Sequence, residues 1–239
     1  MNDSIRAGLD SLAQQVSEGV AEIKPRLRGW LHLASAPLTL AAGIVLIALS
    51  PTAATRLGSV VYVVSSVLLF SVSAVYHRGR WSPRVSGVLR RLDHANIFLL
   101  IAGTYTPFSV VLLQGTDRVV MLSVIWAGAL LGVGFRVLWI DAPRWLCVPI
   151  YIALGSAAAF ALPQFAKGSE RLGVGLGAAV LALIATGGAL YILGGVVYGF
   201  RRPDPWPRWF GFHEVFHSLT VLAFLSHYVG ISLATYALR

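Results

Sequence analysis

Residues 57–77 read LGSVVYVVSSVLLFSVSAVYH, a run that contains no aspartate, glutamate, lysine or arginine and ends at His77. A helix needs about 20 mostly apolar residues to cross about 30 Å of hydrocarbon, so this run predicts a membrane-spanning helix. Its last turn carries two polar side chains, Ser73 and His77, whose spacing of four residues places them on one helix face. Ionisable groups in such segments are costly, so they usually mark a functional site.

Six further stretches are of comparable length, apolar and free of the same charged residues. They are Leu31–Leu49, His94–Leu113, Val119–Phe135, Trp145–Leu162, Leu172–Phe200 and Val215–Leu238. Only 12% of the chain is charged and 56% is hydrophobic, whereas a soluble domain carries about twice that charged fraction. We therefore predict an all-α membrane protein with seven transmembrane helices, in which residues 25–239 form one domain.

The basic residues are distributed unevenly between the two predicted sides of the membrane. The segment before the first span and the loops after the second, fourth and sixth spans carry 14 lysines and arginines, and the other side carries five. Because cytoplasmic loops are enriched in these residues, we expect a cytoplasmic N-terminus and a C-terminus outside. The net charge of +9 then reflects topology and contact with anionic lipids, so we expect membrane lipids and no nucleic acid as partners. The expected location is the inner or plasma membrane of the cell.

A periodic pattern precedes the first span. Apolar residues recur at helical spacing, at Ile5, Leu9, Leu12, Val16, Val20 and Ile23. This spacing predicts a short amphipathic helix within residues 1–24. Lys24-Pro25 ends the pattern, and the predicted topology places this helix on the cytoplasmic side.

Polar residues from three distant spans are expected at one depth. His77 closes the second span, Asp93 opens the third, and His213 and His217 occupy one face of the first turns of the seventh. Catalytic zinc sites take three protein ligands, often imidazole, and leave a fourth position for water. We predict a zinc ion held by His77, His213 and His217, with Asp93 and Ser73 close to the bound water.

Each histidine alone could be a neutral side chain paired with a backbone carbonyl, and only their coincidence favours a metal. His32 and His94 lie at the same depth, and we expect them to lie next to the ligands or at the membrane interface without binding the metal. His227 lies ten residues beyond His217, about 15 Å further along a helix, and cannot share the site.

Glu214 has two possible roles. Residues 213–217 read HEVFH, which matches the H-E-x-x-H pattern of zinc metalloproteases, where the glutamate is the general base. Alternatively, Glu214 caps the first turn of the seventh helix, where a negative charge meets the positive helix end. Both roles are compatible with the sequence.

Together these motifs resemble the hemolysin III branch of the progestin and adiponectin receptor family. The resemblance covers nearly the whole chain and is carried by Pro25-x2-Arg28-Gly29-Trp30-Leu31-His32, Ser73-x3-His77, Leu92-Asp93-His94, residues 102–107 (AGTYTP) and Phe212-His213-Glu214-x2-His217. That family is similar in pattern to alkaline ceramidases and related membrane hydrolases. The resemblance implies a zinc ion on His77, His213 and His217, with Ser73 and Asp93 around the water. Because family members can carry another residue in place of Glu214, it weakens the protease interpretation.

The leading functional hypothesis is a zinc-dependent hydrolase that cleaves a lipid amide or ester reached through the cytoplasmic leaflet. In this hypothesis Asp93 takes a proton and Ser73 helps to stabilise the oxyanion. One alternative is a non-enzymatic sensor or regulator of membrane state, or a pore-forming hemolysin, with structural zinc. The other alternative is an intramembrane metalloprotease that uses Glu214.

Overall fold

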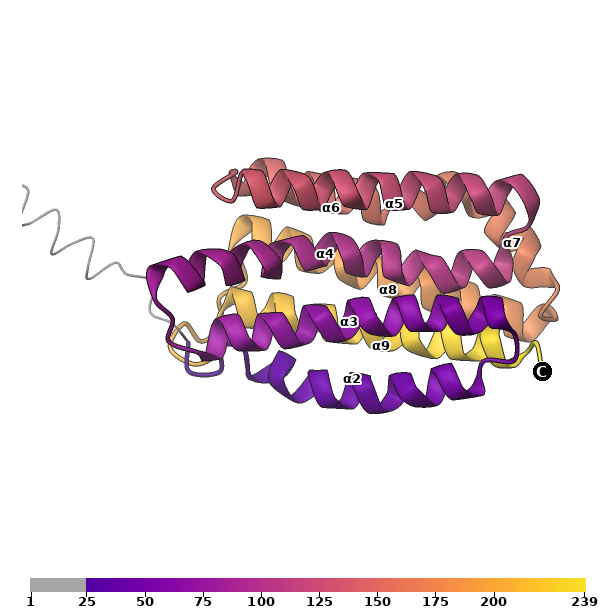
Figure 1. Cartoon of the computed structure of the whole chain (residues 1–239), viewed down its shortest axis with the longest axis horizontal. Helices are drawn as coiled ribbons and strands as arrows, with labels where there is room; N and C mark the ends of the chain where they lie inside the picture. The colour runs from indigo at the N-terminus through magenta and orange to yellow at the C-terminus, as the bar shows by residue number, and fades with distance from the viewer. Residues whose placement is uncertain (1–24) are drawn as a thin grey trace, which may run out of the picture.

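The structure, a computed structural model, describes residues 25–239, and the predicted amphipathic helix of residues 1–24 lies outside this range. The described part forms a bundle of helices that run side by side (Figure 1). In chain order these are α2 (Trp30–Leu49), α3 (Ala53–Arg78), α4 (Pro83–Leu112), α5 (Gly115–Leu138), α6 (Arg144–Gly155), the 3-10 helix η1 (Ala157–Ala161), α7 (Leu162–Glu170), α8 (Val174–Phe200) and α9 (Phe212–Tyr236).

Within residues 25–239, seven helical segments are long and apolar enough to cross a membrane, the fifth being α6, η1 and α7 taken together. The seven-helix prediction is therefore confirmed. Large apolar side chains cover the outside of the bundle, as at Leu131 and Val174, which are 75% and 92% exposed. Such a surface is stable against lipid and costly in water. The chain is a multi-pass membrane protein.

The start of the third span differs from the prediction. Helix α4 begins at Pro83, its first residue, and not near His94. Proline is favoured at the first helical position, and the arginines that follow are good helix formers. The helix therefore begins in a polar stretch before the apolar run, and the pattern of apolar residues does not reveal this start. As a consequence, Asp93 and His94 lie inside α4 and do not open it.

The fifth span is broken where the sequence predicted a continuous run. Helix α6 ends at Gly155, and the chain passes through η1 before α7 resumes. The Tyr105 hydroxyl occupies this break: it donates to the carbonyl of Gly155 and accepts from the amide of Ala158, both at 2.7 Å. Irregular backbone at membrane depth requires such partners because lipid offers none.

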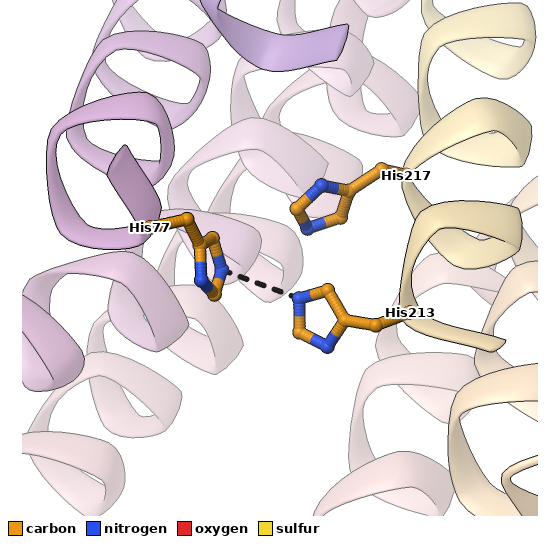
Figure 2. A group of neighbouring side chains, drawn as sticks. All are labelled: His77, His213 and His217. Atoms are coloured by element: carbon orange, nitrogen blue, oxygen red, sulfur yellow. Dashed lines mark hydrogen bonds between the residues drawn. The ribbon is translucent and has the colours of Figure 1, made fainter. Parts of the chain in front are cut away.

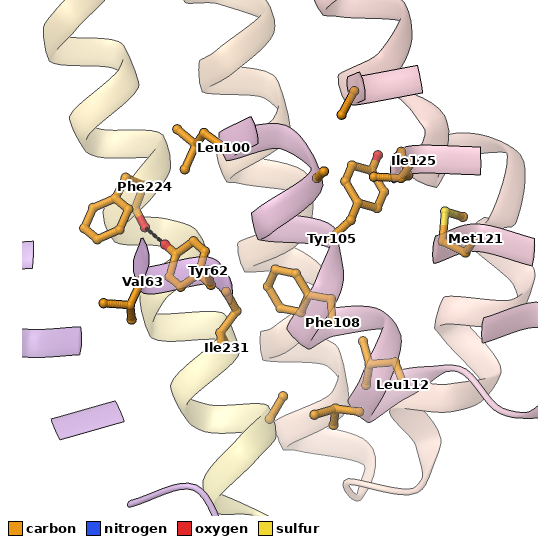
Figure 3. Close-up of a cluster of buried hydrophobic side chains, with 14 of the residues drawn as sticks. Tyr62, Val63, Leu100, Tyr105, Phe108, Leu112, Met121, Ile125, Phe224 and Ile231 are labelled. Carbon is orange, nitrogen blue, oxygen red and sulfur yellow. Dashed lines mark hydrogen bonds between the residues drawn. The ribbon is translucent and has the colours of Figure 1, made fainter. Parts of the chain in front are cut away.

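Helix α9 lies inside the bundle, in contact with α2, α4 and α8. Its link to α3 includes the Tyr62 hydroxyl, which donates to the carbonyl of Phe224 at 3.1 Å within a cluster of buried side chains (Figure 3). Small residues let neighbouring helices approach closely. A methyl group at Gly187 of α8, for example, would lie 2.3 Å from the His227 ring of α9. These contacts determine where the first turns of α9 lie relative to the end of α3.

Candidate metal centre

Three histidine rings converge at the end of the bundle where α3 ends and α9 begins. His77 lies in the last turn of α3, and His213 and His217 lie in the first two turns of α9. The rings point toward one another (Figure 2), and one nitrogen from each lies within 4.8 Å of the other two. The Nε2 atoms of His77 and His213 are 3.2 Å apart. Among the described residues, this is the group of histidine, cysteine and acidic side chains that can hold a metal ion.

Within this group, the His77–His213 pair has the spacing of two ligands on a tetrahedral ion. Two imidazole nitrogens bound to one zinc ion at about 2.0–2.1 Å are about 3.3 Å apart, and the His77–His213 separation is close to that value. His217 is 2% exposed, and one nitrogen of its ring faces the rings of His77 and His213 (Figure 2). A buried imidazole nitrogen is costly unless it is hydrogen-bonded or binds an ion. The chemistry of three neutral imidazoles therefore suits a cation such as Zn²⁺.

Asp93 and Ser73 lie beside the histidines. The Asp93 Oδ2 atom is 3.8 Å from Nε2 of His77, and the Ser73 side chain interacts with the Asp93 carboxylate. Ser73 is buried and Asp93 is largely so, with 15% of its side chain exposed. The five residues predicted for the site are thus brought together, while their roles stay predictions. One acidic group near three imidazoles is the arrangement that proton transfer and ligand orientation require.

The other histidines lie outside this group. The ring of His32 stacks on that of His217, with centroids 3.8 Å apart, and neither nitrogen of His32 has a partner among the described residues. The Nδ1 atom of His94 is 2.8 Å from the carbonyl of Arg90, and Nε2 of His227 is 3.2 Å from that of Ile184. His32 therefore packs against a candidate ligand, whereas His94 and His227 contact backbone carbonyls.

Both carboxylate oxygens of Glu214 have partners at the start of α9. Its side chain is buried, one carboxylate oxygen accepts a hydrogen bond from the amide of Gly211 at 2.9 Å, and the other forms an ion pair with Arg28. A second carboxylate, that of Asp204, accepts from the amide of Phe212 at 2.8 Å. These contacts match the capping role and position the turn that carries His213. The role of Arg28 was missed, although Arg28 belongs to the motif that opens the first span.

An apolar cavity lies next to the histidines. Ser73, Asp93, His213 and His217 are among its polar lining residues. Most of the cavity surface is nevertheless apolar, and contributing side chains include Leu69, Ile97, Leu100, Ile101, Val148 and Ile152. Pockets with an apolar wall and a few convergent polar groups are the usual form of a small-molecule site. The candidate metal centre thus borders a space suited to an apolar chain.

These features define a seven-helix membrane protein in which three histidines converge, and comparisons with known proteins show its family. The sequence profile of the family described as "Haemolysin-III related" matches residues 20–228. The chain belongs to this family.

Individual relatives share between 26% and 31% sequence identity with the chain over the matched residues. A Hemolysin-3 homolog of Bacillus subtilis (strain 168) is 30% identical over 143 residues, which cover 59% of this chain and 63% of that protein. Hemolysin-3 of Bacillus cereus is 31% identical over 151 residues, 63% of this chain and 65% of that protein. The matches thus span somewhat less than two thirds of these relatives. An adiponectin receptor protein of Drosophila melanogaster is 26% identical over 186 residues, 72% of this chain and 41% of the receptor. The predicted resemblance is therefore confirmed.

Proposed function

We propose that this protein is a zinc-dependent hydrolase that cleaves an amide or ester bond in a lipid reached from the cytoplasmic side of the cell membrane. One observation carries the proposal: three imidazoles converge beside a Ser73–Asp93 pair at an apolar cavity. His77, His213 and His217 are the residues that hold the ion. When bound, zinc acts as a Lewis acid and activates water at neutral pH.

The remaining steps depend on side chains of the chain itself. Asp93 accepts the proton released during attack and delivers it to the leaving group. Its carboxylate lies 3.8 Å from the ring of His77, a proposed zinc ligand, and is therefore close to the reacting centre. Ser73 is a short, buried donor next to this carboxylate, and it stabilises the negative charge that develops on the carbonyl oxygen. The apolar cavity receives the acyl chain and keeps bulk water from the reacting bond.

The protease alternative has less support. A general base must have its carboxylate available near the reacting centre, and the carboxylate of Glu214 is engaged by Arg28 and by the amide of Gly211. Structural zinc has one observation in its favour, because His77 and His213 belong to different helices and an ion between them would tie α3 to α9. The experiment below separates this role from catalysis.

The test measures metal and turnover on the same sample. Full-length protein purified in detergent is analysed for zinc by mass spectrometry and incubated with ceramides and acyl esters that release a fluorescent product. We expect about one zinc ion per chain and product release that Asp93→Asn abolishes while zinc is retained. Protein that binds zinc but releases no product from any of these lipids would support the structural role instead. Fractionation of cells tests the proposed location.

A further inference from the structure

A second cavity, with a volume of about 500 Å³, is lined by His77 and His213 and mainly by further polar residues. Of the described residues, four arginines line it: Arg28, Arg90, Arg136 and Arg144. Two of them have acidic partners, since Arg28 pairs with Glu214 and Arg90 pairs with Asp141 at 3.0 Å. The charge of the other two is therefore the feature that needs an explanation.

Arg136 and Arg144 have no carboxylate within 4 Å among the residues that the structure describes. Arg136 is 2% exposed, and it contacts the Cys147 sulfur at 3.0 Å through Nη1, while its Nε has no partner in the described part of the chain. The Nη1 atom of Arg144 is also buried and unpartnered there. The Arg144 guanidinium lies 4.8 Å from the ring centroid of Tyr198, which restricts its position.

Burying a guanidinium without a counter-charge is strongly unfavourable. In membrane proteins such residues therefore usually face a cavity and mark the path of a charged ligand. The planar, fixed donors of arginine match phosphate oxygens in pairs, which a single ammonium group cannot do. Two guanidinium groups that have no carboxylate partner among the described residues thus line one polar cavity, and together they form a site for an anion with several oxygens.

We propose that this cavity binds a phosphate group through Arg136 and Arg144. The group comes either from free phosphate or from the headgroup of a lipid, and the two sources share this chemistry. A lipid headgroup has one structural argument, because His94, Tyr151, Tyr198 and His213 line both this cavity and the apolar one. A lipid with its phosphate at the arginines and its chain in the apolar cavity would cross directly in front of the histidines. Only the relevance of this lipid placement to catalysis rests on the proposed hydrolase function.

Free phosphate is tested on full-length protein in detergent by thermal unfolding, with sodium phosphate titrated against sodium chloride at matched ionic strength. We expect phosphate alone to raise the unfolding temperature in a saturable manner. Arg144→Gln weakens this response at least about tenfold, because it removes charged hydrogen bonds. The matched control is Arg84→Gln, which removes the same charge from an exposed position at the same end of the bundle and outside the cavity lining.

Lipid is tested with nanodiscs of phosphatidylcholine that contain either phosphatidic acid or diacylglycerol, which differ only in the phosphate. Lipid retained by the released protein is measured by mass spectrometry. Retention of phosphatidic acid over diacylglycerol, lost in Arg144→Gln and kept in Arg84→Gln, assigns the site to a headgroup. A response to inorganic phosphate without this preference assigns it to free phosphate. Absence of both responses in the wild-type protein overturns the proposal.

The metal itself could bind phosphate, and variants separate the two cases. If the response survives Arg144→Gln and is lost in His77→Ala, phosphate binds at the metal and the arginine site is wrong. The hydrolase proposal fails independently, through absence of product, because the phosphate measurement requires no turnover. Asp93→Asn, which we expect to be inactive, should bind phosphate like the wild type.

Discussion

The Nε2 atoms of His77 and His213 lie 3.2 Å apart, although the two residues are separated by 136 positions in the chain. They close one end of a contact between α3 and α9 whose middle is formed by Tyr62 and Phe224. Helices α3 and α9 thus contact each other at two places along their length, the candidate metal centre and the Tyr62–Phe224 hydrogen bond.

His77→Ala should lower zinc affinity by at least about 100-fold, because it removes one of three ligands. Zinc content after dialysis against buffers of fixed free zinc measures the change. His227→Ala is the matched control, since it removes an equally buried histidine of α9 that lies outside the group of three. Equal loss of zinc in the two variants would contradict the assigned ligand set.

Asp93→Asn should keep zinc and thermal stability but lower lipid hydrolysis by about 10²–10⁴-fold, since the amide cannot accept the proton. Turnover is measured together with zinc content on the same preparation. A variant that hydrolyses lipid at the wild-type rate would remove Asp93 from the mechanism.

Removal of zinc by a chelator should lower the stability of the wild-type protein by about 3 kcal/mol when the ion had been present at 100 times its dissociation constant. The unfolding temperature in detergent, with and without chelator, measures this effect. In His77→Ala the chelator should cause little change. An equal effect on both proteins would indicate that the stabilising ion binds elsewhere.

Glu214→Gln should destabilise the protein by about 3–5 kcal/mol, because it leaves Arg28 without its buried partner. The folded fraction should still bind zinc and hydrolyse lipid, since the carboxylate is not part of the reacting centre. Thermal unfolding and activity per folded molecule separate the two effects. Loss of hydrolysis at unchanged stability and zinc content would instead support a general base, as in metalloproteases.

Gly187→Ala should destabilise the protein by about 1–3 kcal/mol through overpacking, because the added methyl group would lie 2.3 Å from the His227 ring. Gly188→Ala is the control, as nothing lies within 4 Å of a methyl group there. Unfolding temperatures of the two variants give the comparison. His227→Ala combined with Gly187→Ala should recover part of the loss. Equal stability of both glycine variants would mean that α8 and α9 can move apart at low cost.

The positions of the spans along the membrane normal follow from local sequence. An apolar run such as residues 57–76 must cover the hydrocarbon, so the bilayer thickness determines the depth of the residue that ends it. For this reason the sequence predicts His77, His213 and His217 at one level without knowledge of the helix packing. The start of α4 cannot be predicted in this way, because charged residues outside the hydrocarbon continue a helix without an apolar signal.

The neighbours of each side chain across the bundle depended on the tertiary structure. His94 was expected at the same depth as His77, and the packing of the helices decides its neighbour there, since its Nε2 atom lies 3.4 Å from the hydroxyl of Tyr198 in α8. The partner of Arg28 lies 186 residues away, and the unpaired state of Arg136 could not be read from its neighbours in the chain. Depth is a property of each span by itself, whereas neighbours across the bundle result from the packing of all helices together. For this reason the sequence alone predicted seven spans and one level of polar residues, and only the fold decided which side chains meet there.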